Sequence, residues 1–278
     1  MSSATSLSGL SVAVTGGAHG IGREVARQFS AAGSCVAIGD LDAEGARTAA
    51  EAIGPDALGT GLDVSDREQF AAFLDAAEQH NGPLDVMVNN AGIDWIGRFH
   101  EEPDDVSRRE VEVNVLGTVH GSRLAVQRML PRGRGHIVNV ASGVGRVPLP
   151  GSAVYSATKH AVVGLTESLR LEYRESGLRF SLIQPAQVDT AMLDGQARPK
   201  LLPVVEADDV AAAVLRAVRD NRFEVWVPAS QGVSAKLSAT LPRRAREAIL
   251  RGLGIGKIAG DTDHAERREY HERMFGRS

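Results

Sequence analysis

The chain has 278 residues, 43% of them hydrophobic, and can therefore bury one large core or two small ones. Its formal net charge is −4, which excludes an overall basic field of the kind that attracts nucleic acid. A single cysteine excludes an internal disulfide, and no stretch approaches the roughly 18 apolar residues of a membrane span. Since the N-terminus does not resemble a secretory signal, we expect a cytoplasmic protein. Because the chain lacks an overall basic field, we expect its partner to be a small molecule. No cluster of His, Cys and Asp residues shows the spacing of metal ligands, so a metal site is not expected.

Short apolar runs alternate with longer amphipathic segments over most of the chain. Runs typical of buried strands lie at 10–16, 35–40, 59–64, 84–92, 135–142, 179–186 and 223–228. Segments with helical spacing lie at 20–32, 43–53, 66–80, 104–130, 153–175 and 207–220. This alternation predicts an α/β fold in which helices cover both faces of a parallel sheet. Ligands of such sheets bind beyond the carboxyl ends of the strands.

The turn after the first strand reads TGGAHGIG and places Gly16, Gly20 and Gly22 in a T-G-x-x-x-G-x-G spacing. Glycine lets the backbone turn sharply and lets a diphosphate approach the amide hydrogens at a helix N-terminus. The spacing differs from the G-x-G-x-x-G dinucleotide fingerprint. We interpret the turn as a nucleotide-binding loop, and a plain tight turn is the alternative.

An acidic residue, Asp40, ends the second strand. A carboxylate there can accept hydrogen bonds from the adenosine ribose and would repel a 2′-phosphate. No arginine or lysine lies between Gly33 and Asp42 to bind that phosphate, so the pattern favours NAD over NADP. The alternative is that Asp40 only starts a turn, with Asp42 as the competing ribose ligand. Asp63, after the third strand, either meets the adenine edge or caps the next helix.

The sequence YSATK places Tyr155 four positions before Lys159, in a chain that has four lysines and 27 arginines. Residues at i and i+4 share one face of a helix, so the ammonium can lie close to the phenol. An ammonium is a compact point charge, whereas a guanidinium spreads its charge over a planar fork. A point charge beside a phenol indicates control of the tyrosine pKa.

TGGAHGIG, NNAG at 89–92, Asn114, Ser142 and YSATK occur in an order that resembles the short-chain dehydrogenase/reductase family over residues 8–230. The resemblance implies a single Rossmann-type, doubly wound domain that binds a nicotinamide dinucleotide. It also implies hydride transfer between nicotinamide C4 and a carbinol or carbonyl carbon, and a homodimer or homotetramer.

The family's catalytic tetrad falls on Asn114, Ser142, Tyr155 and Lys159. Tyr155 would move the hydroxyl proton as general base or acid, and Lys159 would favour the phenolate and bind the nicotinamide ribose. Ser142 would hold the reacting oxygen, and Asn114 would hold a water of a proton relay. The alternatives are a turn or cap residue for Ser142 and a structural hydrogen bond for Asn114.

Two further sets of residues are expected to bind ligands. Cofactor contacts are expected from Gly16, His19, Gly20, Ile21, Gly22, Asp40, Asp63, Val64, Asn90, Ala91, Gly92, Tyr155, Lys159, Pro185, Val188 and Thr190. Substrate contacts are expected from Ser142 and from apolar side chains of the loops over the carbonyl site, namely Trp95, Val144, Leu149 and Leu193. One departure is PAQVDT at 185–190, because Ala186 stands where the family has glycine and resists positive φ.

The complete tetrad and the apolar loops predict an NAD-dependent alcohol dehydrogenase or ketone reductase. The substrate would be an apolar secondary alcohol, steroid-like or lipid-like. One alternative is a 3-oxoacyl thioester reductase that uses NADPH, which would be expected to carry a basic docking patch. The other is a non-catalytic dinucleotide sensor, which would be expected to have lost Tyr155 or Lys159.

Residues 231–278 extend beyond the family's common core and carry a net charge of +4, against −8 for the rest. Apolar residues recur every four positions from Leu237 to Leu253, and Pro242 is expected to start a second helix. A short polar helix is expected around Arg267 to Arg273. We expect this helical extension to pack over the substrate entrance or on a neighbouring subunit. Contact with an anionic membrane surface and disorder are the alternatives.

Overall fold

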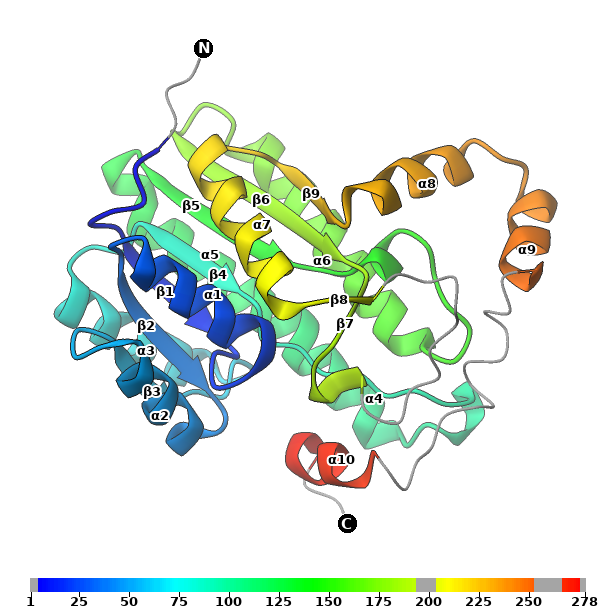
Figure 1. Cartoon of the computed structure of the whole chain (residues 1–278), viewed down its shortest axis with the longest axis horizontal. Coiled ribbons are helices and arrows are strands. Elements are labelled where there is room, and N and C mark those ends of the chain that lie inside the picture. Colours follow the sequence, from blue (N-terminus) through cyan, green and yellow to red (C-terminus); the bar gives the residue numbers. More distant parts are fainter. Residues whose placement is uncertain (1–4, 194–203, 253–266, 276–278) are drawn as a thin grey trace.

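Seven parallel strands form the central sheet of the computed structural model, which describes residues 5–193, 204–252 and 267–275. The strand order is β3-β2-β1-β4-β5-β6-β9 (Figure 1). The strands are β1 (Ser11–Thr15), β2 (Cys35–Asp40), β3 (Leu58–Gly61), β4 (Val86–Asn89), β5 (Gly135–Val140), β6 (Leu178–Pro185) and β9 (Glu224–Val227). The order reverses between β1 and β4, and a ligand crevice opens at such a reversal. The expected Rossmann-type sheet is therefore confirmed.

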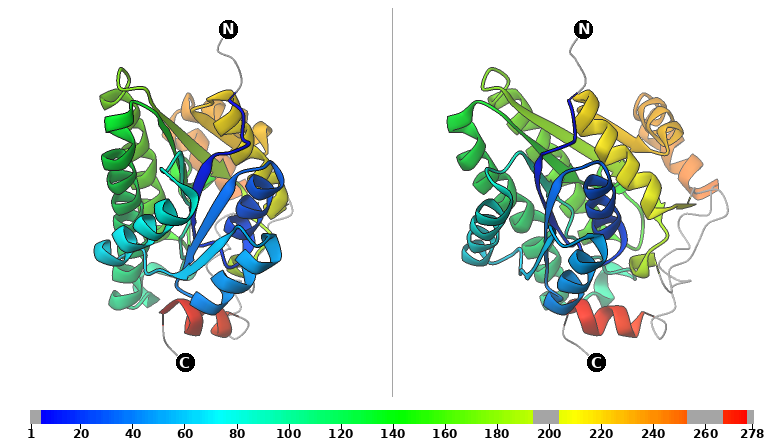
Figure 2. Two further views of the ribbon diagram at one scale, coloured as in Figure 1. Left: turned by 90° about the vertical axis from the view of Figure 1, so that its left-hand side faces the viewer. Right: turned by 60° about the vertical axis from the view of Figure 1, so that its left-hand side comes forward.

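Helices cover both faces of this sheet (Figure 2). One face carries α1 (Gly20–Ala31), α2 (Ala43–Ile53) and α7 (Ala207–Asp220), whose buried residues share a single core cluster with the strands. The other face carries α3 (Arg67–Asn81), α5 (Thr118–Met129) and α6 (Ala153–Glu172). No helix among the described residues is long and apolar enough to cross a membrane.

Acidic residues cap two of the helices. Asp42 precedes α2 and accepts from the backbone N–H of Gly45 at 2.9 Å. Asp66 precedes α3 and accepts from the N–H groups of Glu68 and Gln69 at 2.8 and 3.1 Å. These bonds satisfy amide hydrogens that have no partner within the helix. Asp66, and not Asp63, therefore caps the helix after β3.

The expected single helix over 104–130 contains an irregular turn. It begins as α4 (Asp104–Glu110), becomes a π-helix at Val111–Gly117, and continues as α5. The Thr118 hydroxyl donates to the Asn114 carbonyl oxygen at 2.8 Å within this region. Such π-turns are rare and occur frequently at functional sites. Asn114 lies at the centre of this one.

The C-terminal extension is helical, as expected. It comprises α8 (Ala229–Ala239), α9 (Arg243–Gly252), which starts directly after Pro242, and α10 (Arg268–Phe275). Figure 1 shows α8 and α9 leading away from the sheet, whereas α10 lies against the body near α4. The side chains of Val233 and Leu237 on α8 are exposed, so the apolar stripe is only partly covered in the single chain. Leu253 of that stripe lies outside the described residues.

Glycine packing gives a matched pair of tests for this core. A Cβ added at Gly121 of α5 would lie 1.9 Å from Oδ1 of Asn89 and 2.6 Å from Cζ of Phe70. A Cβ at Gly164 of α6 would meet nothing within 4 Å. We expect Gly121→Ala to lower the free energy of unfolding by about 2 kcal/mol or more, the usual scale of overpacking. Gly164→Ala should raise it by up to about 1 kcal/mol through helix propensity. Urea unfolding would measure both, and equal effects would contradict the packing described.

Candidate active site

The glycine turn between β1 and α1 is held against the loop that follows β4. Gly16 has φ +66°, and a Cβ there would lie 2.8 Å from Cα of Ala91. The Asn90 side-chain amide donates to the carbonyl oxygens of Thr15 and Gly16, both at 3.0 Å. The backbone N–H groups of Asn90 and Ala91 donate to the Thr15 hydroxyl at 3.1 and 3.2 Å. The turn thus requires glycine at position 16. Its hydrogen bonds to the loop after β4 distinguish it from a plain tight turn.

The N-terminus of α1 suits an anionic ligand. His19 occupies the N-cap position and makes no side-chain capping bond, and the first turn contains no acidic residue. The amide hydrogens of this turn therefore have no capping partner, and the helix dipole favours negative charge beside them. A dinucleotide's diphosphate fits these properties.

Asp40 lies in the cavity lining at the end of β2. Its carboxylate accepts from the backbone N–H of Ala18 and of Asp42, both at 3.0 Å. It therefore shapes the turn as well as facing the cavity, so the two interpretations of Asp40 are compatible. Asp42, the proposed competitor, caps α2 and lies 3.4 Å from the His19 imidazole.

Asp63 bonds to residues of its own loop and of α4. Its carboxylate accepts from the backbone N–H and hydroxyl of Ser65, at 2.9 and 2.6 Å. The Arg109 guanidinium donates to it at 2.9 Å. Both Asp63 and Arg109 also line the cavity. The adenine contact expected of Asp63 stays a prediction.

One cavity of about 860 Å³ runs from the glycine turn past the carboxyl ends of the central strands to α8 and α10. All the expected cofactor residues line it except Gly22, where a Cβ would lie 2.0 Å from the carbonyl oxygen of Gly16. Of the tetrad, Ser142, Tyr155 and Lys159 line it, and Asn114 is buried behind it. The roles of these residues in binding and catalysis stay predictions.

Four of the five expected substrate residues also line the cavity, and Trp95 does not. The Trp95 ring packs on Gly97, where a Cβ would lie 2.3 Å from Cη2 of the indole. The backbone N–H of Trp95 donates to Oε1 of Glu110 at 2.6 Å. The neighbouring Ile96 lines the cavity instead. Apolar character alone could not reveal which side of this loop faces the ligand.

Tyr155 and Lys159 lie on the same face of α6, as the i, i+4 spacing predicts. The Lys159 ammonium is 5.6 Å from the centre of the Tyr155 ring and donates to the carbonyl oxygen of Val140 at 3.2 Å. Only 4% of Lys159 is exposed. The one lysine of the α6 motif is therefore a buried cation beside a phenol.

Burial dominates the proton affinities of this pair. It raises the pKa of Tyr155 well above its ordinary value, and the charges of Asp94 and Glu110 raise it further, whereas a hydrogen bond with Ser142 lowers it. Burial also lowers the pKa of Lys159 to about 8, and the same two acidic residues act in the opposite direction. The raised pKa of Tyr155 favours the neutral phenol over the phenolate.

Asn114 connects the loop after β4 to α6. Its side-chain oxygen accepts from the N–H of Ile93 at 2.8 Å, and its amide donates to the Ile93 carbonyl at 2.8 Å. The same amide donates to the Thr158 hydroxyl at 3.0 Å. Asn114 therefore has the structural role that was the alternative to holding a relay water. The relay water expected at Asn114 stays a prediction.

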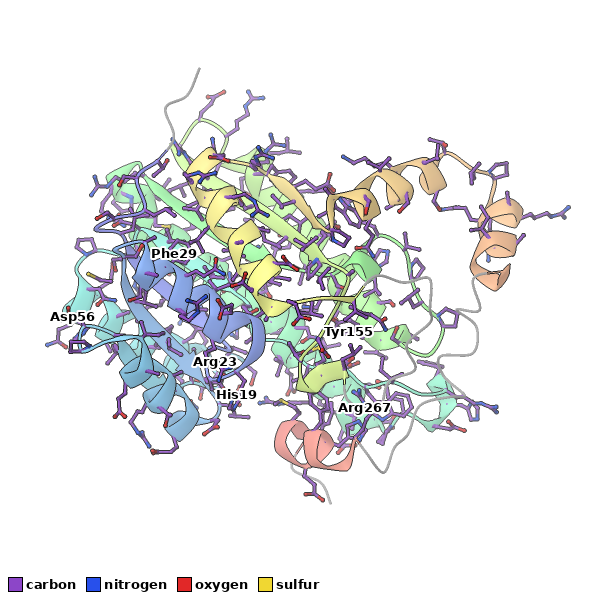
Figure 3. All side chains as sticks on the ribbon, viewed as in Figure 1. His19, Arg23, Phe29, Asp56, Tyr155 and Arg267 are labelled. Carbon is purple, nitrogen blue, oxygen red and sulfur yellow. The ribbon has the colours of Figure 1, made fainter. Side chains whose placement is uncertain are left out.

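Four buried residues near Tyr155 were not anticipated from the sequence. Asp94 forms an ion pair of 2.8 Å with Arg267, and their side chains are 5% and 0% exposed. The backbone N–H of Asp94 donates to the Tyr270 hydroxyl at 3.0 Å. Burial raises the pKa of Glu110 to about 9. Figure 3 shows Tyr155 and Arg267 in the same part of the view, far from Asp56. Three of the four, Asp94, Glu110 and Arg267, are charged residue types that usually lie at a solvated surface.

Comparison with known proteins agrees with this geometry. Residues 11–200 match the family model described as short chain dehydrogenase. The chain belongs to the short-chain dehydrogenase family. This short-chain dehydrogenase is 36% identical over 222 residues to 1-deoxy-11-beta-hydroxypentalenate dehydrogenase of Streptomyces exfoliatus, which covers 77% of this chain and 81% of that protein.

Two further similarities extend the comparison. The chain is 35% identical over 225 residues to glycine betaine reductase ATRR of Emericella nidulans, covering 77% of this chain but spanning only 18% of that protein. It also resembles a Burkholderia phymatum short-chain dehydrogenase/reductase solved in complex with NAD. That match has a TM-score of 0.78 at 28% identity and covers 84% of this chain and 94% of the other.

Ala186, which replaces the family's usual glycine, fits this short-chain dehydrogenase without strain. Among the described non-glycine residues, only Asn221 has a positive φ. The backbone N–H of Ala186 donates to the carbonyl oxygen of Val227 at 2.7 Å. The loop then continues into a two-stranded ribbon of β7 (Gln187–Val188) and β8 (Val204–Val205). Ala186 therefore continues the ordered end of β6.

The raised pKa of Glu110 gives a stability test. The folded state keeps this proton up to about pH 9, whereas an unfolded glutamate loses it near pH 4.5. Stability from this group is therefore fully present below pH 4.5 and is lost as the pH rises toward 9. Glutamine keeps the acceptor for Trp95 and does not titrate. We expect Glu110→Gln to be more stable than wild type at pH 8 by more than about 1 kcal/mol, the value of one pKa unit.

Urea unfolding across the pH range would measure this difference. The exposed Glu51 of α2 provides the control, because Glu51→Gln should leave the pH dependence as in wild type. Parallel stability curves for wild type and Glu110→Gln would contradict a protonated buried carboxyl.

Proposed function

We propose that this short-chain dehydrogenase interconverts an alcohol and a ketone with NAD(H), using Tyr155 to transfer the proton. The observation that carries the proposal is the grouping of Ser142, Tyr155 and Lys159 in the lining of a cavity that also reaches the glycine turn. The nicotinamide ring would supply the hydride donor or acceptor. The protein would supply the proton and hold the reacting oxygen.

Each of the three side chains has a chemical task in this proposal. The Tyr155 hydroxyl gives its proton to the carbonyl oxygen in reduction and takes it back in oxidation. Ser142, which lowers the pKa of the phenol, would hold the same oxygen. The Lys159 ammonium, 5.6 Å from the ring, stabilises phenolate relative to phenol.

The raised pKa of Tyr155 suits its hydroxyl to donate a proton, as reduction requires, better than to accept one. Burial and the acidic neighbours keep Tyr155 protonated, so it is ready to act as an acid. Oxidation requires a phenolate, which needs additional positive charge beyond that of Lys159.

The cavity wall around Tyr155 is mainly apolar and supports an apolar secondary alcohol or its ketone, steroid-like or lipid-like. It includes Ile96, Val144, Val147, Leu149 and Leu193. Similarity to a pentalenate dehydrogenase agrees with an alcohol substrate. We also propose that the enzyme works in the cytoplasm as a homodimer or homotetramer, which sedimentation would test.

A screen of ketones and secondary alcohols with NAD(H) and NADP(H), followed at the nicotinamide absorbance, tests the activity. Turnover of apolar ketones with NADH supports the proposal. A preference for 3-oxoacyl thioesters with NADPH would favour the thioester reductase instead. Dinucleotide binding without turnover of any substrate would favour a sensor.

Tyr155→Phe provides the test of the proton transfer. Loss of the hydroxyl should lower kcat by about two to four orders of magnitude, the usual contribution of a general acid or base. Dinucleotide affinity should change little, since the ring remains. Tyr173→Phe is the matched control, because this half-buried tyrosine stacks on Phe180 away from the cavity. Activity of Tyr155→Phe near the wild-type level would refute the assignment.

Asp40→Asn tests cofactor choice. The amide keeps one of the two oxygens that accept from the N–H groups of Ala18 and Asp42, and it loses the charge that would repel a 2′-phosphate. We expect the ratio of kcat/KM with NAD to that with NADP to fall at least about tenfold, or about 1.4 kcal/mol. Asp42→Asn, at the cap of α2, should leave the ratio unchanged. A wild-type enzyme that already prefers NADP would show that Asp40 does not select the cofactor.

A further inference from the structure

The C-terminal segment of residues 267–275 reaches the active-site cavity from the far end of the chain. Arg267 is fully buried, although it precedes a helix whose sequence is mostly polar. Tyr270 is 5% exposed, and both Tyr270 and Met274 line the same cavity as Tyr155. The segment therefore provides a wall of the site as well as covering the body.

Arg267 connects this wall to two loops of the dehydrogenase core. Its guanidinium donates to the Asp94 carboxylate at 2.8 Å, in the loop after β4. It also donates to the carbonyl oxygen of Met192 at 2.9 Å, in the short helix 191–193 that leaves the β7 strand. Both Asp94 and Met192 line the cavity. A planar guanidinium can hold two such acceptors at once, which a single ammonium cannot do with the same geometry.

Tyr270 strengthens the same attachment. Its hydroxyl accepts from the backbone N–H of Asp94 at 3.0 Å, and the Arg267 guanidinium lies 4.9 Å from the centre of its ring. Asp94 is thus held through its carboxylate by Arg267 and through its backbone by Tyr270. The negative charge of Asp94 also raises the pKa of Tyr155.

We propose that residues 267–275 form a specificity-determining wall of the substrate site, with Arg267 as the positioning residue that fixes the wall to Asp94 and Met192. Tyr270 then limits the size of the group that lies beside the reacting carbon. The wall selects ketones with one compact substituent, and the remaining cavity toward α8 accepts the longer one. This inference rests on the proposed alcohol and ketone chemistry.

Variants of the full-length protein test the positioning role of Arg267. In Arg267→Met the arginine is replaced by an apolar side chain of similar length and Asp94 loses its charged partner. We expect KM for ketones to rise at least about tenfold while kcat changes less than about threefold and the dissociation constant for NAD stays within about twofold. Arg267→Met combined with Asp94→Asn removes both charges and should recover part of the loss. Arg246→Met, on the exposed side of α9, is the matched control.

The size limit is tested separately with Tyr270→Ala. A series of ketones in which the smaller substituent grows from methyl to phenyl would be compared with wild type. We expect the ratio of kcat/KM for the phenyl ketone to that for the methyl ketone to rise at least about tenfold. The same ranking in both proteins would overturn the wall as a determinant of specificity.

A measurement that needs no substrate separates this inference from the activity itself. Amide hydrogen exchange should accelerate at least about tenfold at residues 93–97 and 268–275 in Arg267→Met and remain unchanged at β1 and α1. If wild type reduces no ketone but the exchange responds as expected, the proposed function fails and the attachment stands. If exchange at 93–97 is unchanged, Arg267 does not position this loop and the inference fails.

Discussion

Hydrogen bonds between the loops after β1 and β4 determine the crevice in which the rest of the site is assembled. The strand order reverses between β1 and β4, so the segments that follow these two strands lead to opposite faces of the sheet. Beyond the strand ends, the backbone hydrogen bonds of the sheet no longer join the two segments. Asn90 provides the missing connection by donating to the carbonyl oxygens of Thr15 and Gly16. The glycine turn and the loop that carries Asp94 are therefore one unit, and Asn114 extends it to α6 through Ile93 and Thr158.

Charge balance around Lys159 depends on residues from distant parts of the chain. A buried ammonium loses hydration, and the charge of Asp94 partly restores its affinity for the proton. Asp94 is itself buried and is paired with Arg267, more than 170 residues later. Leaving one charge of such a pair without its partner usually costs several kcal/mol, about 3–5. The C-terminal segment is consequently paired with an acidic residue that raises the proton affinity of Lys159, although every motif typical of the family lies before it.

The strands and most helices could be predicted because their signals are local. Apolar runs such as VAV in β1 and the glycine spacing of 16–22 each act within a few positions. The pairing of Tyr155 with Lys159 follows from helical spacing in the same way. The position of Arg267 does not, because ERREYHERMF has the composition of a solvated helix and its partner Asp94 follows an unrelated strand. Trp95 was assigned to the substrate for its apolar ring, but the side of a loop that faces a ligand depends on neighbours such as Gly97.

The π-turn at Val111–Gly117 has a consequence for how substitutions in this helix should be understood. A π-turn accommodates one residue more than an α-helical turn, and each residue of an α-helix rotates the side-chain direction by about 100°. The faces of α4 and α5 therefore follow two separate helical phases, with Asn114 between them. Val106 and Glu110 are buried in the first phase, and Leu124, Ala125 and Met129 in the second. A tolerance map plotted on one continuous helical wheel would scatter these positions, whereas two wheels joined at Asn114 would each show a single intolerant stripe.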